Sequence, residues 1–279
     1  MNSIYNKKKK EINIHLVSDS TGETIENTVS ATISQFPDVH RKEFFWPMTR
    51  TEDQIKDITQ NLKKNPGLVV FSIVDDKNRA LLEDSCKNMN MPFVSPLDSL
   101  LNILKEILAL SETKITGVQH RLDENYFRRI DAFEFAMQHD DGQRISSMGD
   151  ADIILVGVSR TSKTPTSIYL ANKGLKVANI PLVANTQLPE ELFGFKKPII
   201  IGLIKDPRSL MQVRQTRLKM MGENNLTSYD DINHIKFEIS QARLIYTKYG
   251  WPSVDVSRRS VEETSASVIK IYNNKGTPF

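Results

Sequence analysis

Residues 151–172 read ADIILVGVSRTSKTPTSIYLAN and join a buried-strand pattern, a phosphate-loop pattern and a helix without a break. The branched apolar run at residues 153–158 is typical of a parallel strand buried on both faces. Residues 157–164 match the Walker A pattern G-x-x-x-x-G-K-[ST] at every fixed position but one, because Ser162 stands where the second glycine is usual. The stretch therefore predicts a nucleotide site between a strand and a helix.

The chemistry expected of this loop follows from its backbone. Successive N–H groups point inward and the next helix presents its positive N-terminal end to the same point, so anions bind there. Lys163 is expected to reach the terminal phosphates, and Thr164 to place its hydroxyl on a magnesium ion. A positive φ at Ser162 would strain the backbone where glycine would not. A chance Ser/Thr-rich turn is the alternative, which the strand and helix on either side disfavour. The predicted nucleotide-binding residues are Gly157, Val158, Ser159, Arg160, Thr161, Ser162, Lys163 and Thr164.

Length and composition set the broad class of protein. A chain of 279 residues with 39% apolar content is long enough for two domains with real cores. Its 37 basic and 34 acidic residues nearly balance, which gives no case for nucleic-acid or membrane binding. Cys86 is the single cysteine, so neither an intramolecular disulfide nor a cysteine-based metal site can form. With no signal-peptide core and no apolar run near the ~20 residues of a membrane span, we expect a cytoplasmic protein.

The N-terminal half predicts a second strand, loop and helix unit. A strand at residues 12–17 runs into a polar loop and then a helix. The loop residues Ser18, Asp19, Ser20, Thr21 and Gly22 could hold an anion, but such residues also cap helices. The pattern leaves both interpretations open.

A predicted helix before the phosphate loop carries Tyr126, Phe127, Ile130, Phe133 and Met137 on one face, a stripe interpreted as core. It is followed by His139, Asp140, Asp141 and Gly142. Carboxylates near a helix C-terminus oppose the helix dipole, which suggests metal or hydroxyl binding. A solvated turn is equally compatible with this composition.

Alternating strands and helices in the C-terminal half predict a parallel sheet with helices on both faces. Further strands are expected at residues 177–183, 198–204 and 253–256. With a boundary in residues 143–150, the fold class is α/β: an N-terminal α/β domain at 1–149 and a P-loop kinase-like domain at 150–279. Asp206 and Asp255 are both candidates for the Walker B aspartate.

Two arginine pairs are candidates for anion binding. Arg214 and Arg217 lie three apart in a helical segment and would project from one side, where guanidinium groups could close over phosphates as a lid. Ordinary surface arginines are the alternative. Arg258 and Arg259, before the last helix, form the second pair.

These segments together resemble one family, the pyruvate, phosphate dikinase regulatory proteins and the related phosphoenolpyruvate synthase regulatory proteins. The resemblance covers nearly the whole chain and rests on four stretches: SDSTGET at 18–24, HRLDENYFRRIDAFEFAMQHDDG at 120–142, ADIILVGVSRTSKTPTSIYLA at 151–171 and VDVSRRSVEETSA at 254–266. Ser162 resembles the dikinase branch, whereas the synthase branch tends to carry glycine there. Departures are small, such as Ser257 where threonine is common.

The resemblance implies a bifunctional enzyme. Such proteins inactivate the dikinase by phosphorylating an active-site threonine near its phosphorylated histidine, with ADP as donor and AMP as product. They reactivate it by phosphate-dependent removal of that group, which yields pyrophosphate. ADP, inorganic phosphate and magnesium are therefore the expected cofactors and co-substrates, and the dikinase is the expected protein partner; a homo-oligomer stays open.

Expected residue roles follow from that reaction. Lys163 should stabilise charge on the β-phosphate, and Asp19 or Asp141 should orient the threonine hydroxyl. The second anion site is expected at Ser18, Ser20, Thr21 and Gly22 or at Arg214 and Arg217. Three alternatives remain: a regulator directed at the synthase, a small-molecule P-loop kinase, and a non-catalytic ADP-sensing module.

Overall fold

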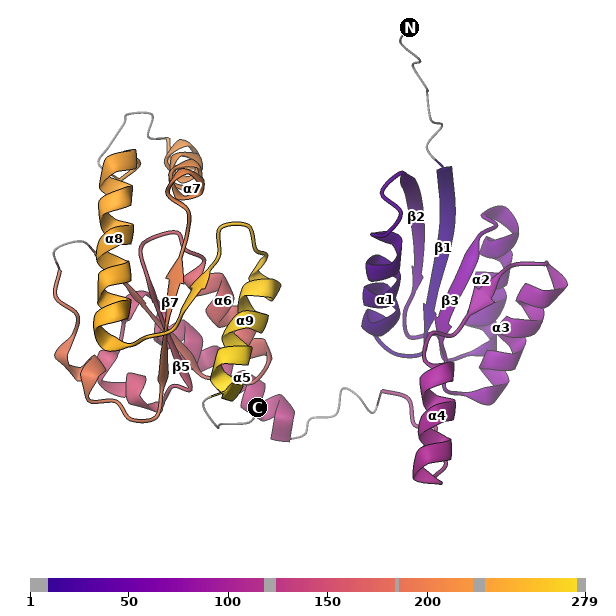
Figure 1. The fold of residues 1–279 in the computed structure, drawn as a ribbon. Coiled ribbons are helices and arrows are strands. Elements are labelled where there is room, and N and C mark those ends of the chain that lie inside the picture. Colours follow the sequence, from indigo (N-terminus) through magenta and orange to yellow (C-terminus); the bar gives the residue numbers. More distant parts are fainter. Residues whose placement is uncertain (1–9, 118–123, 184–185, 223–228, 275–279) are drawn as a thin grey trace, which may run out of the picture. The chain divides into compact units, whose positions relative to one another are not determined.

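Two four-stranded parallel sheets, each flanked by helices, make up the chain. The computed structural model describes residues 10–117, 124–183, 186–222 and 229–274. It divides into two compact units, Met1–Arg121 and Leu122–Phe279 (Figure 1), and each is described by itself. The α/β fold class predicted from the sequence is thereby confirmed.

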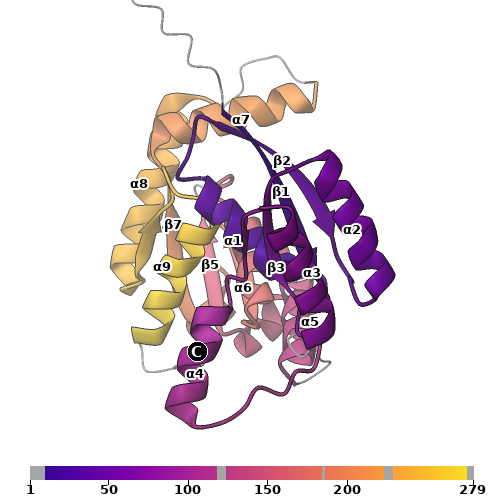
Figure 2. The same cartoon turned by 90° about the vertical axis from the view of Figure 1, so that its right-hand side faces the viewer.

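The first unit has the sheet order β2-β1-β3-β4. Residues Ile14 and Leu16 of β1 pack with α1 on one face, and Val17 packs with α2 and α3 on the other. Figure 2 shows the same arrangement, with α1 and the α2–α3 pair on opposite sides of the sheet. The elements are β1 (Lys10–Ser18), α1 (Glu23–Ile33), β2 (Val39–Trp46), α2 (Glu52–Lys64), β3 (Leu68–Ser72), α3 (Asp76–Asn88), β4 (Phe93–Val94) and α4 (Asp98–Leu108).

The second unit has the sheet order β6-β5-β7-β8. All five residues of β5 are buried, because it lies inside the sheet with helices on both faces. Its helices and 3₁₀ turns before the sheet are α5 (Glu124–Gln138), η2 (Asp140–Gly142) and η3 (Ile145–Asp150). The remaining elements are β5 (Ile153–Gly157), α6 (Lys163–Asn172), β6 (Val177–Pro181), η4 (Glu190–Phe193), β7 (Ile199–Ile204), α7 (Pro207–Met220), α8 (Ile232–Tyr249), β8 (Ser253–Asp255) and α9 (Val261–Asn274).

Strand β5 supplies side chains to two separate cores. Ile154 and Val156 pack with residues of α7 and α8, whereas Ile153 and Leu155 pack with residues of α6 and α9. The alternation follows from the two-residue period of a strand. The phosphate loop therefore leaves a strand that is held firmly on both faces.

The boundary between the units lies earlier than the sequence indicated. The prediction put α5 in the first domain, which was to end at residue 149, but α5 belongs to the second unit. Ala132 and Ala136 of α5 form a buried cluster with Ala171 of α6. Small side chains let the two helices approach closely, and this packing joins α5 to the nucleotide-binding unit.

The sequence predicted that the large apolar residues on one face of α5 belong to the core, and the structure corrects this prediction. The structure buries Ala132 and Ala136, whereas Phe127 is 56% exposed and Met137 is 73% exposed. Of the predicted stripe, Phe133 packs against this alanine cluster and Tyr126 is half-buried, whereas Phe127, Ile130 and Met137 are exposed. No helix in the described parts of the chain is long and apolar enough to span a membrane.

Candidate active site

Gly157 ends β5 and begins the phosphate loop at a point where no side chain fits. A Cβ atom there would lie 2.7 Å from the Thr161 hydroxyl oxygen and 2.9 Å from the Leu203 carbonyl oxygen. Both distances are too short, so the loop must begin at a glycine. Thr161 is fully buried and its hydroxyl donates to the Val158 carbonyl at 2.9 Å, which closes the loop on itself.

Ser162 adopts a left-handed backbone conformation, with φ 64° and ψ 26°. A positive φ at this position is the source of backbone strain that the sequence predicted. Ser162 is the N-cap of α6, and its side chain makes no capping hydrogen bond. Arg160 also has a positive φ of 71°, which the motif did not predict. Non-glycine residues adopt this region at a cost of about 1–2 kcal/mol each, so the loop holds two unfavourable backbone conformations.

Lys163 is the buried cation of the site. Its side chain is 5% exposed, and its ammonium donates to the Val158 carbonyl at 3.2 Å. Burial lowers the pKa of Lys163 to about 8, although the charges of Asp141 and Asp140 oppose the shift. An anion in the loop would add to the opposite charge of these two carboxylates and so favour the charged ammonium.

Thr164 is held by a carboxylate from the segment before β5. Its hydroxyl donates to Asp140 Oδ1 at 2.9 Å, and the Asn179 amide donates to the same oxygen. The Asn179 carbonyl oxygen in turn accepts from the backbone N–H of Asp141 at 3.1 Å. Residue Asn179 of β6 thus fixes both aspartates of η2 beside the loop.

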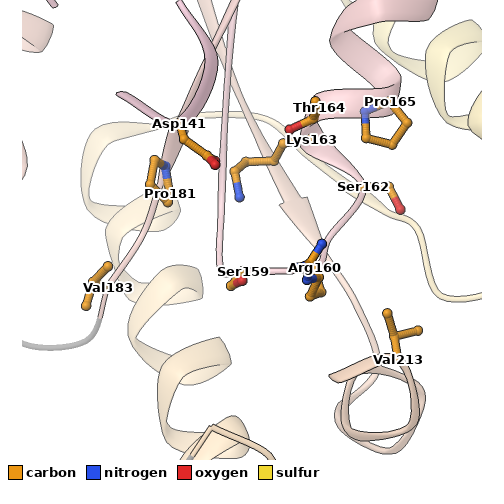
Figure 3. A pocket seen from close by; sticks show the side chains of 10 residues that line it. All are labelled: Asp141, Ser159, Arg160, Ser162, Lys163, Thr164, Pro165, Pro181, Val183 and Val213. Carbon is orange, nitrogen blue, oxygen red and sulfur yellow. The ribbon is translucent and has the colours of Figure 1, made fainter. Parts of the chain in front are cut away.

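A cavity of about 570 Å³ opens over the loop (Figure 3). The Lys163 side chain extends towards the part of the cavity where Asp141 lies, as Figure 3 shows. The lining residues are Asp141, Ser159, Arg160, Ser162, Lys163, Thr164, Pro165, Pro181, Val183 and Val213. The site thus combines anion-binding groups with a carboxylate that faces the same space.

The polar loop of the first unit is built differently. Asp19 is buried, and its Oδ2 accepts from the Val74 N–H at 2.7 Å and from the Thr116 hydroxyl at 3.3 Å. The Ser18 hydroxyl accepts from the Ser20 N–H at 3.1 Å. Gly22, with φ 82°, is the N-cap of α1, so the N-cap residue itself has no side chain to cap that helix. Asp19 and Asp141 therefore belong to separate units.

Arg214 and Arg217 do not form the paired cationic surface that their spacing predicted. The Arg214 side chain is 1% exposed and its guanidinium pairs with Glu238 at 2.7 Å. It also donates to the Tyr229 carbonyl at 2.8 Å and to the Ser159 carbonyl at 3.3 Å. Arg217 is exposed on the same helix. The charge of Arg214 is already neutralised by Glu238 inside the fold, so it is not available for an anion. Arg214 instead supports the phosphate loop through the Ser159 carbonyl.

Neither Walker B candidate contacts the Walker threonine in the described structure. Asp206 caps α7 by accepting from the Ser209 N–H at 3.0 Å, and Asp255 accepts from the Ser257 N–H at 2.9 Å. The carboxylate beside Thr164 is Asp140. In the described residues, no three His, Cys, Asp or Glu side chains come together as a metal cage.

Two further residues of the site did not stand out in the sequence. Asn179 is fully buried in a strand of otherwise apolar residues and Pro181, a polar exception that could have been noticed. The Tyr229 hydroxyl lies 3.2 Å from the Ser159 hydroxyl and accepts from Arg160 Nε at 3.3 Å. Nothing in the sequence near Tyr229 marks it, because its role depends on where α7 and α8 place it.

The fold and this pocket define a kinase-like phosphotransferase. The chain belongs to the kinase/pyrophosphorylase family, whose model matches residues 14–269. A relative from Paramagnetospirillum magneticum, named as a pyruvate, phosphate dikinase regulatory protein, is 46% identical over 263 residues, or 94% of this chain and 85% of the relative. Relatives with the same name from Erythrobacter litoralis and Sphingopyxis alaskensis are 43% identical over 266 residues, which cover 95% of this chain and 96% and 98% of theirs. The predicted family resemblance is confirmed.

Proposed function

We propose that this protein regulates pyruvate, phosphate dikinase by adding a phosphoryl group to a threonine of that enzyme and by removing it. The observation that carries the proposal is the pocket itself, where the buried ammonium of Lys163 and the carboxylate of Asp141 face one cavity over a phosphate loop. The names of the relatives support the dikinase as the target, and the residues of the site support phosphoryl transfer as the reaction.

In the inactivating direction, the threonine oxygen attacks the β-phosphorus of ADP and the bond from that phosphorus to the bridging oxygen breaks. AMP leaves with the electron pair, and the threonine proton passes to Asp141. Lys163 and the backbone N–H groups of the phosphate loop would stabilise the charge that develops on the β-phosphate and on the leaving oxygen. The pKa of Lys163 should rise when the phosphates bind, because they add negative charge close to the ammonium.

In the activating direction, an oxygen of inorganic phosphate attacks the phosphorus of the phosphothreonine. The bond from phosphorus to the threonine oxygen breaks, that oxygen takes the proton of the attacking hydrogen phosphate, and pyrophosphate leaves. No water has to be activated, but a second anion must be held. The loop formed by Ser18, Ser20, Thr21 and Gly22 remains a candidate for that task.

Magnesium fits the residues beside the loop. The Thr164 hydroxyl and the Asp140 carboxylate lie 2.9 Å apart, and such a hydroxyl and carboxylate hold magnesium in P-loop enzymes. Because no larger cage is found in the described residues, these two groups would hold the ion together with nucleotide phosphates. When bound, the ion would neutralise charge on the phosphates.

The test uses ADP labelled on its β-phosphate, incubated with the dikinase in its phosphohistidine form. We expect label on a dikinase threonine and release of AMP. Lys163→Ala should lower the rate of phosphoryl transfer in both directions at least 100-fold, since a preorganised charge in such a site contributes on the order of 3 kcal/mol. Lys173→Ala is the matched control, because Lys173 is exposed at the far end of α6.

The other outcomes assign other functions. Label on phosphoenolpyruvate synthase and none on the dikinase would identify the synthase as target. Label on a metabolite would identify a small-molecule kinase. Bound ADP without any transfer would identify a sensing module, and full activity of Lys163→Ala in either direction would remove the loop from the mechanism.

A further inference from the structure

A second cavity, of about 560 Å³, lies at the ends of β7 and β8 in the nucleotide-binding unit. Both strands run parallel to β5, in the order β5-β7-β8. Their carboxyl ends therefore lie on the same sheet edge as the phosphate loop. Neighbouring strands lie ~4.8 Å apart, so β7 and β8 are one and two strand positions from β5 along this edge. The lining residues are Asp206, Arg208, Ser209, Asp255, Ser257, Arg258 and Arg259.

The floor of this second cavity is tied together by Ser257. Its hydroxyl accepts from the backbone N–H of Asp206 at 2.7 Å and donates to the Asp255 carboxylate. The hydrogen bonds connect the end of β7 to the end of β8. Both carboxylates are also engaged by backbone N–H groups, Asp206 by Ser209 and Asp255 by Ser257.

The charge on the rim is basic. Three guanidinium groups face two carboxylates that already have hydrogen-bond donors, which leaves an excess of positive charge and of N–H groups. Arg259 donates to the Ser267 hydroxyl at 2.7 Å. In the described residues, neither Arg208 nor Arg258 makes a hydrogen bond or an ion pair. Each guanidinium has five N–H donors in a planar fork that matches the oxygens of a phosphate group.

From this arrangement we infer that the second cavity is a binding site for a phosphate dianion, distinct from the phosphate loop. The ligand chemistry is a phosphate group held by Arg208 and Arg258 above the floor tied by Ser257. Two sources carry that group: free inorganic phosphate and a phosphorylated side chain of a protein substrate. The choice between these sources rests on the proposed function, but the binding itself does not.

The binding test uses the full chain with ¹⁵N-labelled arginine Nε groups, titrated with inorganic phosphate and followed by NMR. The Nε–H signals of Arg208 and Arg258, assigned by single substitution to Gln, should shift with saturation. Arg208→Gln/Arg258→Gln should weaken phosphate binding at this cavity at least tenfold. Arg217→Gln is the matched control, because Arg217 carries the same charge on α7 and lies outside this cavity.

Arginine signals that do not shift with phosphate, or that shift equally in the Arg217→Gln and double variants, would overturn the inference. This result does not depend on whether the protein transfers phosphoryl groups. Melting temperatures of all variants should stay within a few degrees of the parent, since both arginines are exposed.

The source of the phosphate group is decided by steady-state kinetics of the same double variant. If free phosphate is the ligand, the KM for phosphate in the activating direction should rise at least tenfold and the KM for dikinase should not change. If a phosphorylated side chain is the ligand, the KM for phosphothreonine dikinase in the activating direction, or for phosphohistidine dikinase in the inactivating direction, should rise instead. Unchanged values for both substrates, with binding intact in the parent, would remove the cavity from the reaction.

Discussion

Lys163 is kept inside the protein at a cost to stability that the nucleotide would relieve. Its pKa falls from an ordinary value of 10.5 to about 8 because burial disfavours the charged ammonium. Between these two pH values the unfolded chain binds more protons than the native one, so native stability rises with pH across this window. Below pH 8 the buried ammonium lowers the free energy of unfolding by its full amount, at most about 3 kcal/mol.

Lys163→Met should therefore stabilise the unliganded protein. Methionine keeps the length of the side chain without the buried charge, and we expect a higher free energy of unfolding at pH 7 by about 1–3 kcal/mol. The gain over the parent should shrink as the pH rises from 8 to 10.5. Urea unfolding at several pH values measures it. Lys173→Met, at an exposed position, should show no such dependence; a Lys163→Met variant less stable than the parent at pH 7 contradicts the account.

Ser162 shows what a motif can leave undetermined at a single position. Its left-handed conformation costs about 1–2 kcal/mol that glycine would avoid, and this cost is partly offset because glycine would lose more entropy on folding. Serine is therefore tolerated in the loop. The fold requires a positive φ at position 162, and serine can meet this requirement although glycine is usual there.

At the scale of elements, helix α7 is joined to the phosphate loop by one buried arginine. Arg214 connects Glu238 of α8 to the Ser159 carbonyl of the loop, and the Tyr229 ring lies 4.5 Å from its guanidinium carbon. Breaking a buried ion pair by removing one partner is more damaging than replacing both, because a charge is left without compensation.

Arg214→Leu should lower the free energy of unfolding by about 3 kcal/mol, since Glu238 then remains buried and unpaired. The double variant Arg214→Leu/Glu238→Leu should recover part of that loss. Calorimetric ADP titration should show weaker binding in both variants, because Ser159 loses its support. Equal stability of the single and double variants would contradict a role for the uncompensated charge. Arg217→Leu, exposed on α7, serves as the control.

At the scale of the whole molecule, the division into units determines which segments complete the site. Helix α5 and the turn η2 precede the strand that begins the phosphate-loop motif, but they pack with α6 and β6. Asp140 and Asp141 reach the loop through this packing. A nucleotide-binding unit that began at residue 150 would lack both carboxylates.

Fragments with different starting points test this division. We expect residues 122–279 to fold alone and to bind ADP within about threefold of the full chain, because α5 and η2 are retained. A fragment of residues 150–279 should unfold at a lower temperature and bind ADP at least tenfold more weakly. Circular dichroism melts and calorimetric titration measure both properties. Equal affinity in the two fragments would show that Asp140 and Asp141 do not contribute to nucleotide binding.

The sequence by itself determined the α/β class and the strand, loop and helix of residues 151–172. It could do so because a strand buried on both faces and a phosphate loop depend on residues adjacent in the chain. Strand β2 was missed, because most of its residues are exposed and it carries little apolar pattern. The boundary was misplaced because the buried contact between α5 and α6 is made by Ala132, Ala136 and Ala171, with Phe133 packed against them, and small alanines give no strong apolar signal in the sequence.

Only the tertiary structure decided which polar groups share the site. It brought Asp140 to Thr164 and Asn179 to both aspartates, and it turned Arg214 inward to an ion pair while Arg217 stayed exposed. Spacing along a helix says which side chains are neighbours, but not which of them the rest of the fold covers. The phosphate loop was therefore readable in the sequence, whereas the carboxylates and arginines around it depend on contacts between segments far apart in the chain.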